Sequence, residues 1–234
     1  MTNTDPAELA KFSALAHRWW DATGEFRALH DINPLRLDWI AQVTGGLAGK
    51  TIVDIGCGGG LVSEGMARRG DAATRVTGLD MAEKPLAVAK LHALESELAI
   101  DYQLSTAESW AASHPARYDI VTCLEMLEHV PDPARVVAAC AQLAKPGAPL
   151  FFSTINRNLL AYATVVVGAE YVLGLLPKGT HEYAKFITPA QLAKMARDAG
   201  LRVDRIRGME YNPFTHTARW SERPWVNYAL LCYK

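Results

Sequence analysis

The sequence has few cysteines, almost no net charge, and no apolar run long enough to cross a membrane. Its 234 residues include four cysteines, and none of them forms a C-x-x-C pair. This usage is typical of free thiols in a reducing cytosol rather than of a disulfide or zinc framework. The formal net charge is -1, so the composition provides no basic surface for nucleic acid, and none is expected as a partner.

The sequence also lacks an export signal. Residues 1–9 are polar and acidic, without the basic start and apolar core of a signal peptide. The apolar stretch Leu159–Leu176 is interrupted by Glu170 and small residues, and a spanning helix needs roughly 20 apolar residues. Basic residues flank this stretch, so it can lie in a membrane interface, cover a substrate pocket or form an extra core helix pair. A cytoplasmic protein is expected.

The most informative stretch is Thr51–Gly60, where a β-branched apolar strand runs directly into a glycine loop. Gly56, Gly58 and Gly60 allow backbone angles that side chains disfavour and let a ligand approach the main chain. The G-x-G-x-x-G dinucleotide fingerprint is not met, because its last position falls on Leu61 or Ser63. The pattern is instead D-x-G-x-G-x-G, which begins at Asp54.

Two acidic residues favour a cationic nucleoside ligand at this loop. Asp54 lies at the end of the strand, and its charge suits an ammonium and a sulfonium group better than a pyrophosphate. Asp80 closes the next predicted strand, Arg75–Leu79. A carboxylate in that place can accept hydrogen bonds from both ribose hydroxyls.

Strand and helix patterns alternate along the chain after the loop, which predicts parallel βαβ units with helices on both faces of the sheet. The last two predicted strands, Leu201–Met209 and Trp225–Tyr233, have no helix between them and are expected to pair antiparallel. The count gives a seven-stranded sheet with a terminal antiparallel hairpin. Before the loop, Asn33-Pro34 is expected to break the chain and start a new helix at Leu35.

The segment Cys123–Pro133 places Glu125, Glu128 and His129 on a turn between a strand end and a helix start. Oxygen ligands of this kind can converge on Mg²⁺. His129 can alternatively serve as a general base. A third interpretation is that Glu128 and His129 only hold the turn together, while Leu124 lines an adenine pocket.

Two further residues are open to two interpretations each. Arg36 can clamp a ligand carboxylate in bidentate fashion, or it can be a solvated helix arginine. Glu108 can accept the adenine amino group, or it can be an acid in the first turn of a helix.

More specific segments extend the pattern beyond the loop. They are His17-Arg18-Trp19-Trp20-Asp21, Asp31-Ile32-Asn33-Pro34-Leu35-Arg36, Glu125-Met126-Leu127-Glu128-His129-Val130, Phe152-Ser153-Thr154-Ile155-Asn156-Arg157-Asn158 and Gly168-Ala169-Glu170-Tyr171. Together with the loop, these segments resemble the ubiquinone-biosynthesis O-methyltransferase family over nearly the whole chain.

The resemblance implies an α/β, Rossmann-like class I methyltransferase fold and a single domain over residues 1–234. Within it, residues 1–49 would form a helical cover and 50–155 the cofactor-binding core. Residues 156–187 would form an apolar insert that acts as a lid or membrane contact, and 188–234 the last helix and strands.

The resemblance also implies the chemistry. S-adenosylmethionine would methylate ring hydroxyls of polyprenylated catechol or hydroquinone intermediates, at two steps of ubiquinone synthesis. The cofactor residues that the resemblance implies are Arg36, Gly56, Asp80 and Leu124, and the loop pattern adds Asp54 and Gly58. Magnesium at Glu125, Glu128 and His129 is implied by the family's eukaryotic branch, with His129 as the alternative base. The resemblance implies the prenylated substrate as partner. The apolar insert with its basic ends adds anionic lipid on the inner face of the cytoplasmic membrane, and other ubiquinone-biosynthesis enzymes are also expected as partners.

Three rival functions follow from the same sequence. A C-methyltransferase of a related quinone pathway would use the same cofactor. A nicotinamide-dependent oxidoreductase is disfavoured because the dinucleotide fingerprint fails. A lipid-surface binding module is favoured by the apolar insert but not by the glycine loop and Asp80.

Overall fold

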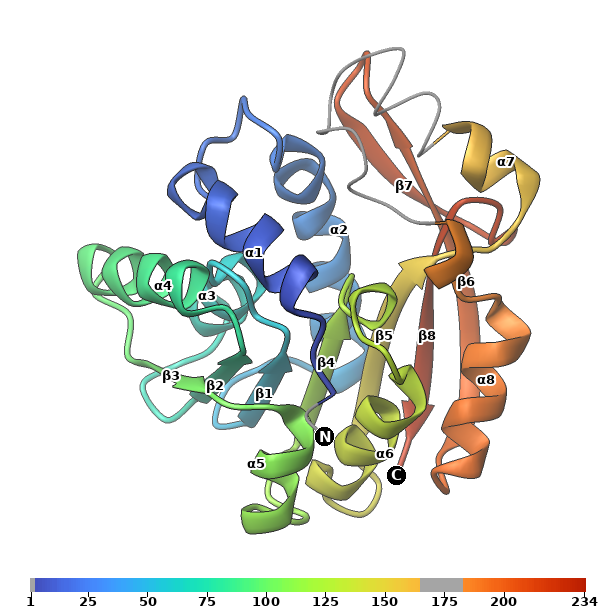
Figure 1. The fold of residues 1–234 in the computed structure, drawn as a ribbon. Helices are drawn as coiled ribbons and strands as arrows, with labels where there is room; N and C mark the ends of the chain where they lie inside the picture. Colours follow the sequence, from blue (N-terminus) through green and yellow to red (C-terminus); the bar gives the residue numbers. More distant parts are fainter. Residues whose placement is uncertain (1–2, 165–182) are drawn as a thin grey trace.

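The structure, a computed structural model, describes residues 3–164 and 183–234. Its described part contains an eight-stranded sheet in the order β3-β2-β1-β4-β5-β8-β6-β7 (Figure 1). The parallel strands are β1 (Thr51–Ile55), β2 (Arg75–Asp80), β3 (Ile100–Leu104), β4 (Ile120–Leu124) and β5 (Pro149–Ile155). The antiparallel strands are β6 (Arg202–Asn212), β7 (Thr217–Ser221) and β8 (Asn227–Tyr233).

The predicted fold class is confirmed, but the prediction of seven strands is wrong. Residues 217–221 form β7, an edge strand that pairs with the end of the long strand β6. Its sequence was missed because an edge strand buries little surface and needs no run of apolar residues. The terminal hairpin is therefore β6–β7, and β8 lies between β5 and β6.

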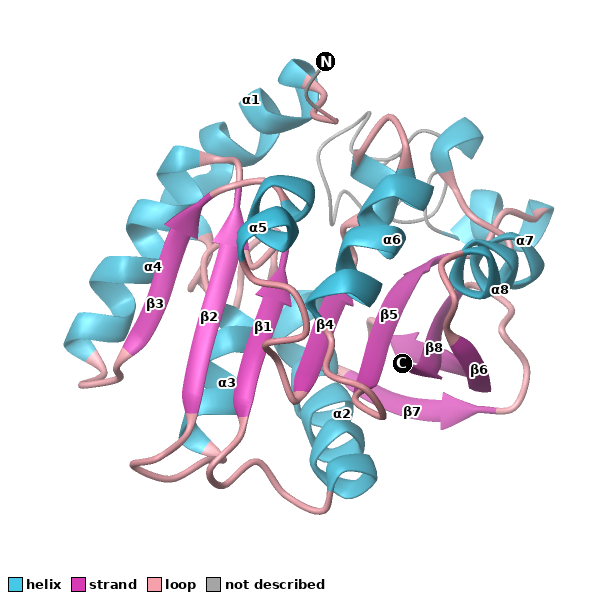
Figure 2. Ribbon diagram, turned by 90° about the horizontal axis from the view of Figure 1, so that it is seen from below, coloured by secondary structure: helices cyan, strands magenta, loops and turns pink. Residues whose placement is uncertain are grey.

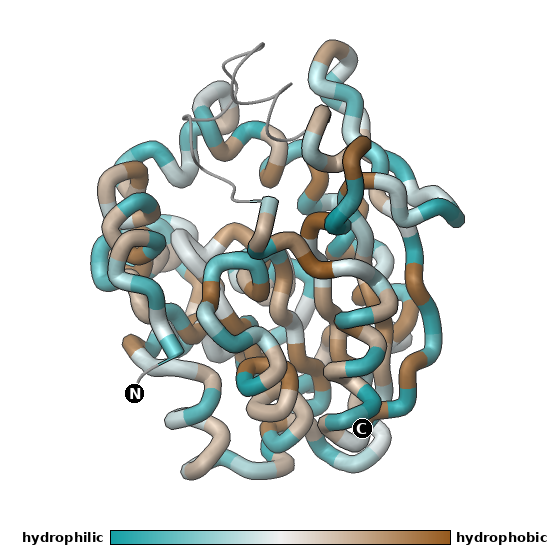
Figure 3. The backbone as a smooth tube through the Cα atoms, turned by 45° about the vertical axis from the view of Figure 1, so that its right-hand side comes forward, coloured by the Kyte–Doolittle hydropathy of each residue, from teal (hydrophilic) through white to brown (hydrophobic). Residues whose placement is uncertain are grey.

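Helices cover both faces of the sheet (Figure 2). On one face, α5 (Ala107–Ser113), α6 (Pro133–Leu143) and α8 (Pro189–Asp198) bury apolar side chains against the strands. On the other, α2 (Arg27–Thr44) and α3 (Leu61–Arg68) do the same. The helix α4 (Glu83–Glu95) packs on Tyr102 of β3. In Figure 3 the brown, apolar segments of the chain lie mainly between the polar outer ones.

The predicted chain break at Asn33-Pro34 is wrong, because α2 runs through Pro34 without interruption. A proline inside a helix removes one backbone hydrogen bond and costs about 3 kcal/mol. Burial offsets that cost: Leu37, Trp39 and Ile40 are each at most 4% exposed and join the core under β1 and β5. A proline in the sequence therefore does not end a helix whose apolar face is long and buried.

The remaining elements lie around the carboxyl ends of the parallel strands. The helix α1 (Pro6–Leu15) and the short 3-10 helix η1 (Ala16–Arg18) precede α2, and η2 (Leu127–His129) follows β4. Two short pieces belong to the predicted insert, α7 (Leu159–Ala161) and η4 (Tyr183–Lys185). Residues 165–182 of that insert, including Gly168-Ala169-Glu170-Tyr171, lie outside the described residues.

Candidate functional site

A cavity of about 960 Å³ opens at the carboxyl ends of the parallel strands. One part of it is lined by the glycine loop, by the end of β2 and by α2, and the other by η2 and the ends of β6 and β8. Because the carboxyl ends of β1, β2, β4 and β5 meet at one edge, residues far apart in sequence gather there. The volume lies at the upper end of the range of small-molecule pockets, and different elements line its two parts.

Hydrogen bonds to β2 and two tryptophan side chains fix the position of the glycine loop. The N–H groups of Gly56 and Cys57 donate to the Leu79 carbonyl, at 2.8 and 3.0 Å, which ties the loop to β2. Gly58 has a φ of 53° and lies under the Trp19 indole, so a Cβ there would collide with the ring. The Trp20 Nε1–H donates to the Gly59 carbonyl at 2.9 Å. The segment before α2 therefore lies over the loop.

Arg36 and Asp54 are buried charges at the base of the cavity. The Arg36 side chain is not a solvated helix arginine, since the residue is only 4% exposed. Its Nη1 lies 3.8 Å from Glu125 Oε1, and its Nε is buried without a hydrogen-bond partner among the described residues. Such an orphaned donor is costly unless a ligand satisfies it. The guanidinium fits a ligand carboxylate.

Asp54 accepts hydrogen bonds from the hydroxyls of Ser63 and Thr122, each at 2.7 Å. Burial raises the pKa of its carboxyl group to about 6, although both hydroxyls and the charge of Arg36 act to lower it. A buried carboxylate of this kind is stabilised when a cationic ligand group binds beside it. With the guanidinium of Arg36, it suits the two charges of an amino-acid zwitterion.

Asp80 ends β2 at the rim of the same cavity. Its two oxygens accept the N–H groups of Gly58, at 2.8 Å, and Ala82, at 2.7 Å. Each carboxylate oxygen retains lone-pair capacity for a ribose hydroxyl. Burial raises the pKa of Asp80. Leu124 also lines the cavity, at the end of β4.

Glu108 lines the cavity but already has protein partners. The Asn3 side-chain amide donates to it at 2.9 Å, and it occupies the first turn of α5. These contacts favour the interpretation of Glu108 as a helix first-turn acid.

The structure brings Glu125, Glu128 and His129 to the cavity wall, but each side chain is engaged separately. Glu125 accepts the Ser153 hydroxyl at 2.6 Å, and Glu128 accepts the Thr154 hydroxyl at 2.8 Å. Within residues 3–164 and 183–234, no three His, Cys, Asp or Glu side chains gather in an arrangement that holds a metal ion. The described side chains therefore do not fit a magnesium site in this arrangement.

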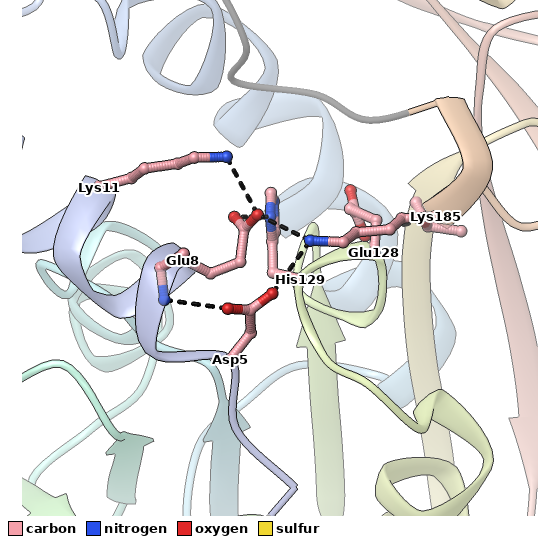
Figure 4. Close-up of polar contacts among 8 residues, drawn as sticks. Asp5, Glu8, Lys11, Glu128, His129 and Lys185 are labelled. Atoms are coloured by element: carbon pink, nitrogen blue, oxygen red, sulfur yellow. Dashed lines mark hydrogen bonds and ion pairs between the residues drawn. The ribbon is translucent and has the colours of Figure 1, made fainter.

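His129 contacts a carboxylate that the sequence did not point to. Its Nδ1 lies 3.0 Å from Glu8 Oε2, and Glu8 is brought there by α1 (Figure 4). Lys185 also contacts Glu8, at 3.0 Å. Burial lowers the pKa of His129, but Glu8 and Glu128 more than offset this, so the pKa lies above its ordinary value. For Glu8 the directions are reversed. Burial raises the pKa of its carboxyl group, but the hydrogen bonds from His129 and Lys185 lower it to about 2.

Sequence reasoning missed Glu8 and Lys185 because nothing local marks them. Glu8 is separated from His129 by 121 residues, and a single glutamate on a helix normally faces solvent. Only its burial, at 4% exposure, reveals the contact. A buried carboxylate without a partner would be strongly destabilised, so the burial and the pairing go together.

Comparisons with known proteins point to one family. A model of the methyltransferase domain matches residues 29–206. A ubiquinone biosynthesis O-methyltransferase of Azoarcus sp. (strain BH72) is 60% identical, over 98% of this chain and 97% of its own. The protein of the same name from Stutzerimonas stutzeri (strain A1501) is 58% identical, over 100% of this chain and 99% of its own.

Solved structures share the fold at low identity. Magnesium protoporphyrin IX methyltransferase from Synechocystis PCC 6803, with bound SAM, has a TM-score of 0.66 at 19% identity, and all of both chains is covered. A SAM-dependent methyltransferase from Aquifex aeolicus has a TM-score of 0.61 at 13% identity, over 98% of each chain.

Proposed function

The chain belongs to the ubiquinone biosynthesis O-methyltransferases, and from this membership we propose that it methylates ring hydroxyls of polyprenylated catechol and hydroquinol intermediates, with S-adenosylmethionine as methyl donor. One observation carries the proposal. A single cavity joins the buried pair Arg36 and Asp54 to the turn that bears His129. The donor and the ring would thus lie in contact, as in-line methyl transfer requires.

The cofactor half of the cavity suits S-adenosylmethionine group by group. When bound, this cofactor supplies a methyl group on a sulfonium sulfur, which is open to attack by oxygen. Arg36 would hold its carboxylate, Asp54 its ammonium group and Asp80 its ribose hydroxyls. Gly56 and Gly58 would shape the loop beside the cofactor, because they adopt positive φ angles and leave room for Met126 and Trp19 to pack on the loop. Leu124 would pack beside the adenine.

On the substrate half, we assign proton transfer to His129. A phenol has a pKa of about 10, so its hydroxyl must lose a proton as the carbon–oxygen bond forms. In the neutral ring, Nδ1–H donates to Glu8, which leaves Nε2 as the basic nitrogen. Glu8 is thus a positioning residue. His129 would take up the hydroxyl proton as the ring oxygen accepts the methyl group, and the electron pair of the former carbon–sulfur bond would stay on the donor's sulfur. No step is assigned to magnesium.

The pH dependence of cofactor binding tests the role of Asp54. Its ionised form attracts the ammonium group, and its pKa is about 6. We therefore expect the affinity for S-adenosylhomocysteine to be constant above pH 7 and to fall as the pH drops below 6, by up to about tenfold per unit. Calorimetric titration between pH 5 and 8 measures this. An Asp54→Asn variant should bind more weakly and lose most of this dependence, and an unchanged profile in it would refute the assignment.

The domain plan predicted from the sequence gives each segment a role in this proposal. Residues 1–49 would cover the cofactor and 50–155 would bind it. Residues 156–187 would cover the substrate or contact the membrane, and 188–234 would supply the last helix and strands. Other ubiquinone-biosynthesis enzymes are predicted to be further partners.

We further propose that the protein reaches its prenylated substrate by peripheral contact with anionic lipid on the inner face of the cytoplasmic membrane. Among the described residues no helix is both long and apolar enough to cross a membrane. Leu159 is 81% exposed and Leu160 47% exposed, at the start of the insert. Arg157 precedes them, which supports contact with an interface that is apolar and negatively charged.

Replacing both Leu159 and Leu160 by aspartate should weaken binding to vesicles that contain phosphatidylglycerol by about tenfold or more, because apolar contact is lost and negative charge is added. Co-sedimentation measures the effect. The matched control is the pair Leu91→Asp and Leu94→Asp on α4, where the leucines are 63% and 75% exposed. Equal binding by both double variants would contradict the proposal.

A further inference from the structure

A second polar cluster lies at the substrate half of the cavity, and the proposed chemistry uses none of its side chains. The Tyr211 hydroxyl donates to Asp31 Oδ2 at 2.7 Å, which joins the end of β6 to α2. His216, in the turn between β6 and β7, places Nδ1 3.3 Å from the same Asp31 oxygen and 3.2 Å from the Tyr211 hydroxyl. Tyr211 and His216 both line the cavity.

The hydrogen bonds that Tyr211 already makes determine whether its hydroxyl can donate to a ligand or accept from it. A phenol hydroxyl can donate one hydrogen bond, and Tyr211 donates it to Asp31. Burial and the neighbouring carboxylate raise the pKa of Tyr211 to about 12, so the proton stays on the hydroxyl. Nδ1 of His216 faces two acceptors and therefore carries a hydrogen. The Tyr211 oxygen has two lone pairs, and even if His216 uses one, the other can only accept.

The position of Tyr211 relative to the catalytic turn follows from the sheet. Met209 and Tyr211 point to the same face of β6, because side chains alternate along a strand. Met209 pairs with Asn227 of β8, and the Asn227 amide lies 3.4 Å from Glu125 Oε2. Two residues along a strand span about 7 Å. Tyr211 is therefore beyond the Met209–Asn227 pair, away from Glu125 and next to Asp31 of α2.

The turn before β7 also has an unusual backbone. His216 has a φ of 54°, in the left-handed region, which is uncommon for residues other than glycine and costs free energy. The contacts of its ring with Asp31 and Tyr211 offset that cost. The hairpin is thus fixed on α2 by the same cluster that faces the cavity.

We infer that Tyr211 is a specificity-determining residue. Its hydroxyl donates to Asp31, so its oxygen faces the ligand as an acceptor. This oxygen accepts a hydrogen bond from a ring hydroxyl on the opposite side of the ring from the hydroxyl that is methylated. This inference rests on the proposed function. A hydroquinol carries such a hydroxyl, whereas the corresponding quinone has only a carbonyl acceptor there. Two acceptors repel each other, and a buried polar group left without a partner is costly. The site thus selects the reduced substrate. A catechol without the distant hydroxyl does not use Tyr211.

The two substrate classes provide an internal comparison. Tyr211→Phe keeps the ring and removes the hydroxyl, which is the proposed acceptor for the ligand and also the donor to Asp31. We expect kcat/KM for a geranylated hydroquinol substrate to fall about tenfold, as for the loss of one substrate hydrogen bond. For a geranylated catechol that lacks the distant hydroxyl, kcat/KM should change less than twofold. The matched control is Tyr233→Phe, because Tyr233 ends β8 and contacts Arg202 outside the cavity lining.

Asp31→Ala gives the second, opposite test. Without Asp31, the Tyr211 hydroxyl can turn its proton toward the ligand and become a donor. We expect the quinone form of the geranylated substrate to bind severalfold more tightly to Asp31→Ala than to the unaltered protein, as measured by calorimetry with S-adenosylhomocysteine present. A variant that had only lost structure would bind both forms more weakly.

The outcomes separate the inference from the proposed function. Equal losses on hydroquinol and catechol in Tyr211→Phe, or weaker quinone binding in Asp31→Ala, would overturn the role of Tyr211. Methylation of the catechol by the unaltered protein would in either case still support the proposed function. If the unaltered protein methylated neither ring, both the proposed function and the inference would fail.

Discussion

Replacing Asp80 by alanine is expected to lower the affinity for S-adenosylhomocysteine by about 100-fold or more. The carboxylate would lose its hydrogen bonds to the ribose hydroxyls, and each charge-assisted bond contributes about 1.5–3 kcal/mol, where 1.4 kcal/mol is tenfold. The loop would also lose an anchor, because Asp80 accepts the Gly58 and Ala82 N–H groups. Calorimetric titration measures the loss directly.

The matched control for this prediction is Asp101→Ala, which removes an exposed carboxylate from the neighbouring strand β3. It should leave the affinity unchanged. NADH, which would bind an oxidoreductase of similar fold, should bind none of these proteins. Wild-type affinity in Asp80→Ala, or NADH binding to the unaltered chain, would show that the loop has been misinterpreted.

Replacing His129 by alanine is expected to lower kcat by about 10²- to 10⁴-fold, the usual contribution of a general base. Cofactor affinity should change little, since His129 lies on the other half of the cavity. Glu8→Gln should reduce kcat in the same direction but less, because glutamine can still accept the Nδ1–H bond while the negative charge is lost. Steady-state kinetics with a geranylated catechol, together with cofactor titration, separates the two effects.

A more acidic substrate distinguishes a base from a residue that only holds the turn. A nitro-substituted catechol is ionised at the assay pH and needs no base, so it should restore most of the rate lost in His129→Ala. The control variant is His114→Ala, at the end of α5, which should behave as wild type on both substrates. If the nitro substrate suffers the same loss as the plain catechol, His129 has a structural role instead.

The residues proposed for the cofactor half could be named from the sequence because their signals are local. The alternation of strands and helices, the glycines after β1 and the acid that closes β2 each lie in one short stretch, and the parallel topology then brings them to one edge. Arg36 was open to two interpretations, because helix periodicity does not tell whether an arginine faces solvent or a cavity. Its burial, at 4% exposure, decides between them.

The substrate half could not be predicted because it is built from pairs distant in sequence. Glu8 meets His129 across 121 residues and Asp31 meets Tyr211 across 180. No periodicity records such contacts. The edge strand β7 and the helix through Pro34 were missed for a related reason, since pairing with β6 and burial of α2 override the local preferences of their residues. The magnesium prediction rested on three neighbouring residues whose side chains turn to different partners.

The most direct test of the account is to follow a labelled methyl group. The protein is incubated with S-adenosylmethionine that carries a ¹³C-methyl group and with a geranylated catechol, and the product is analysed by mass spectrometry and NMR. The account predicts a monomethyl ether with the label on oxygen, formed at a rate that collapses in His129→Ala. Label on a ring carbon, or no transfer from a protein that binds both ligands, would contradict it.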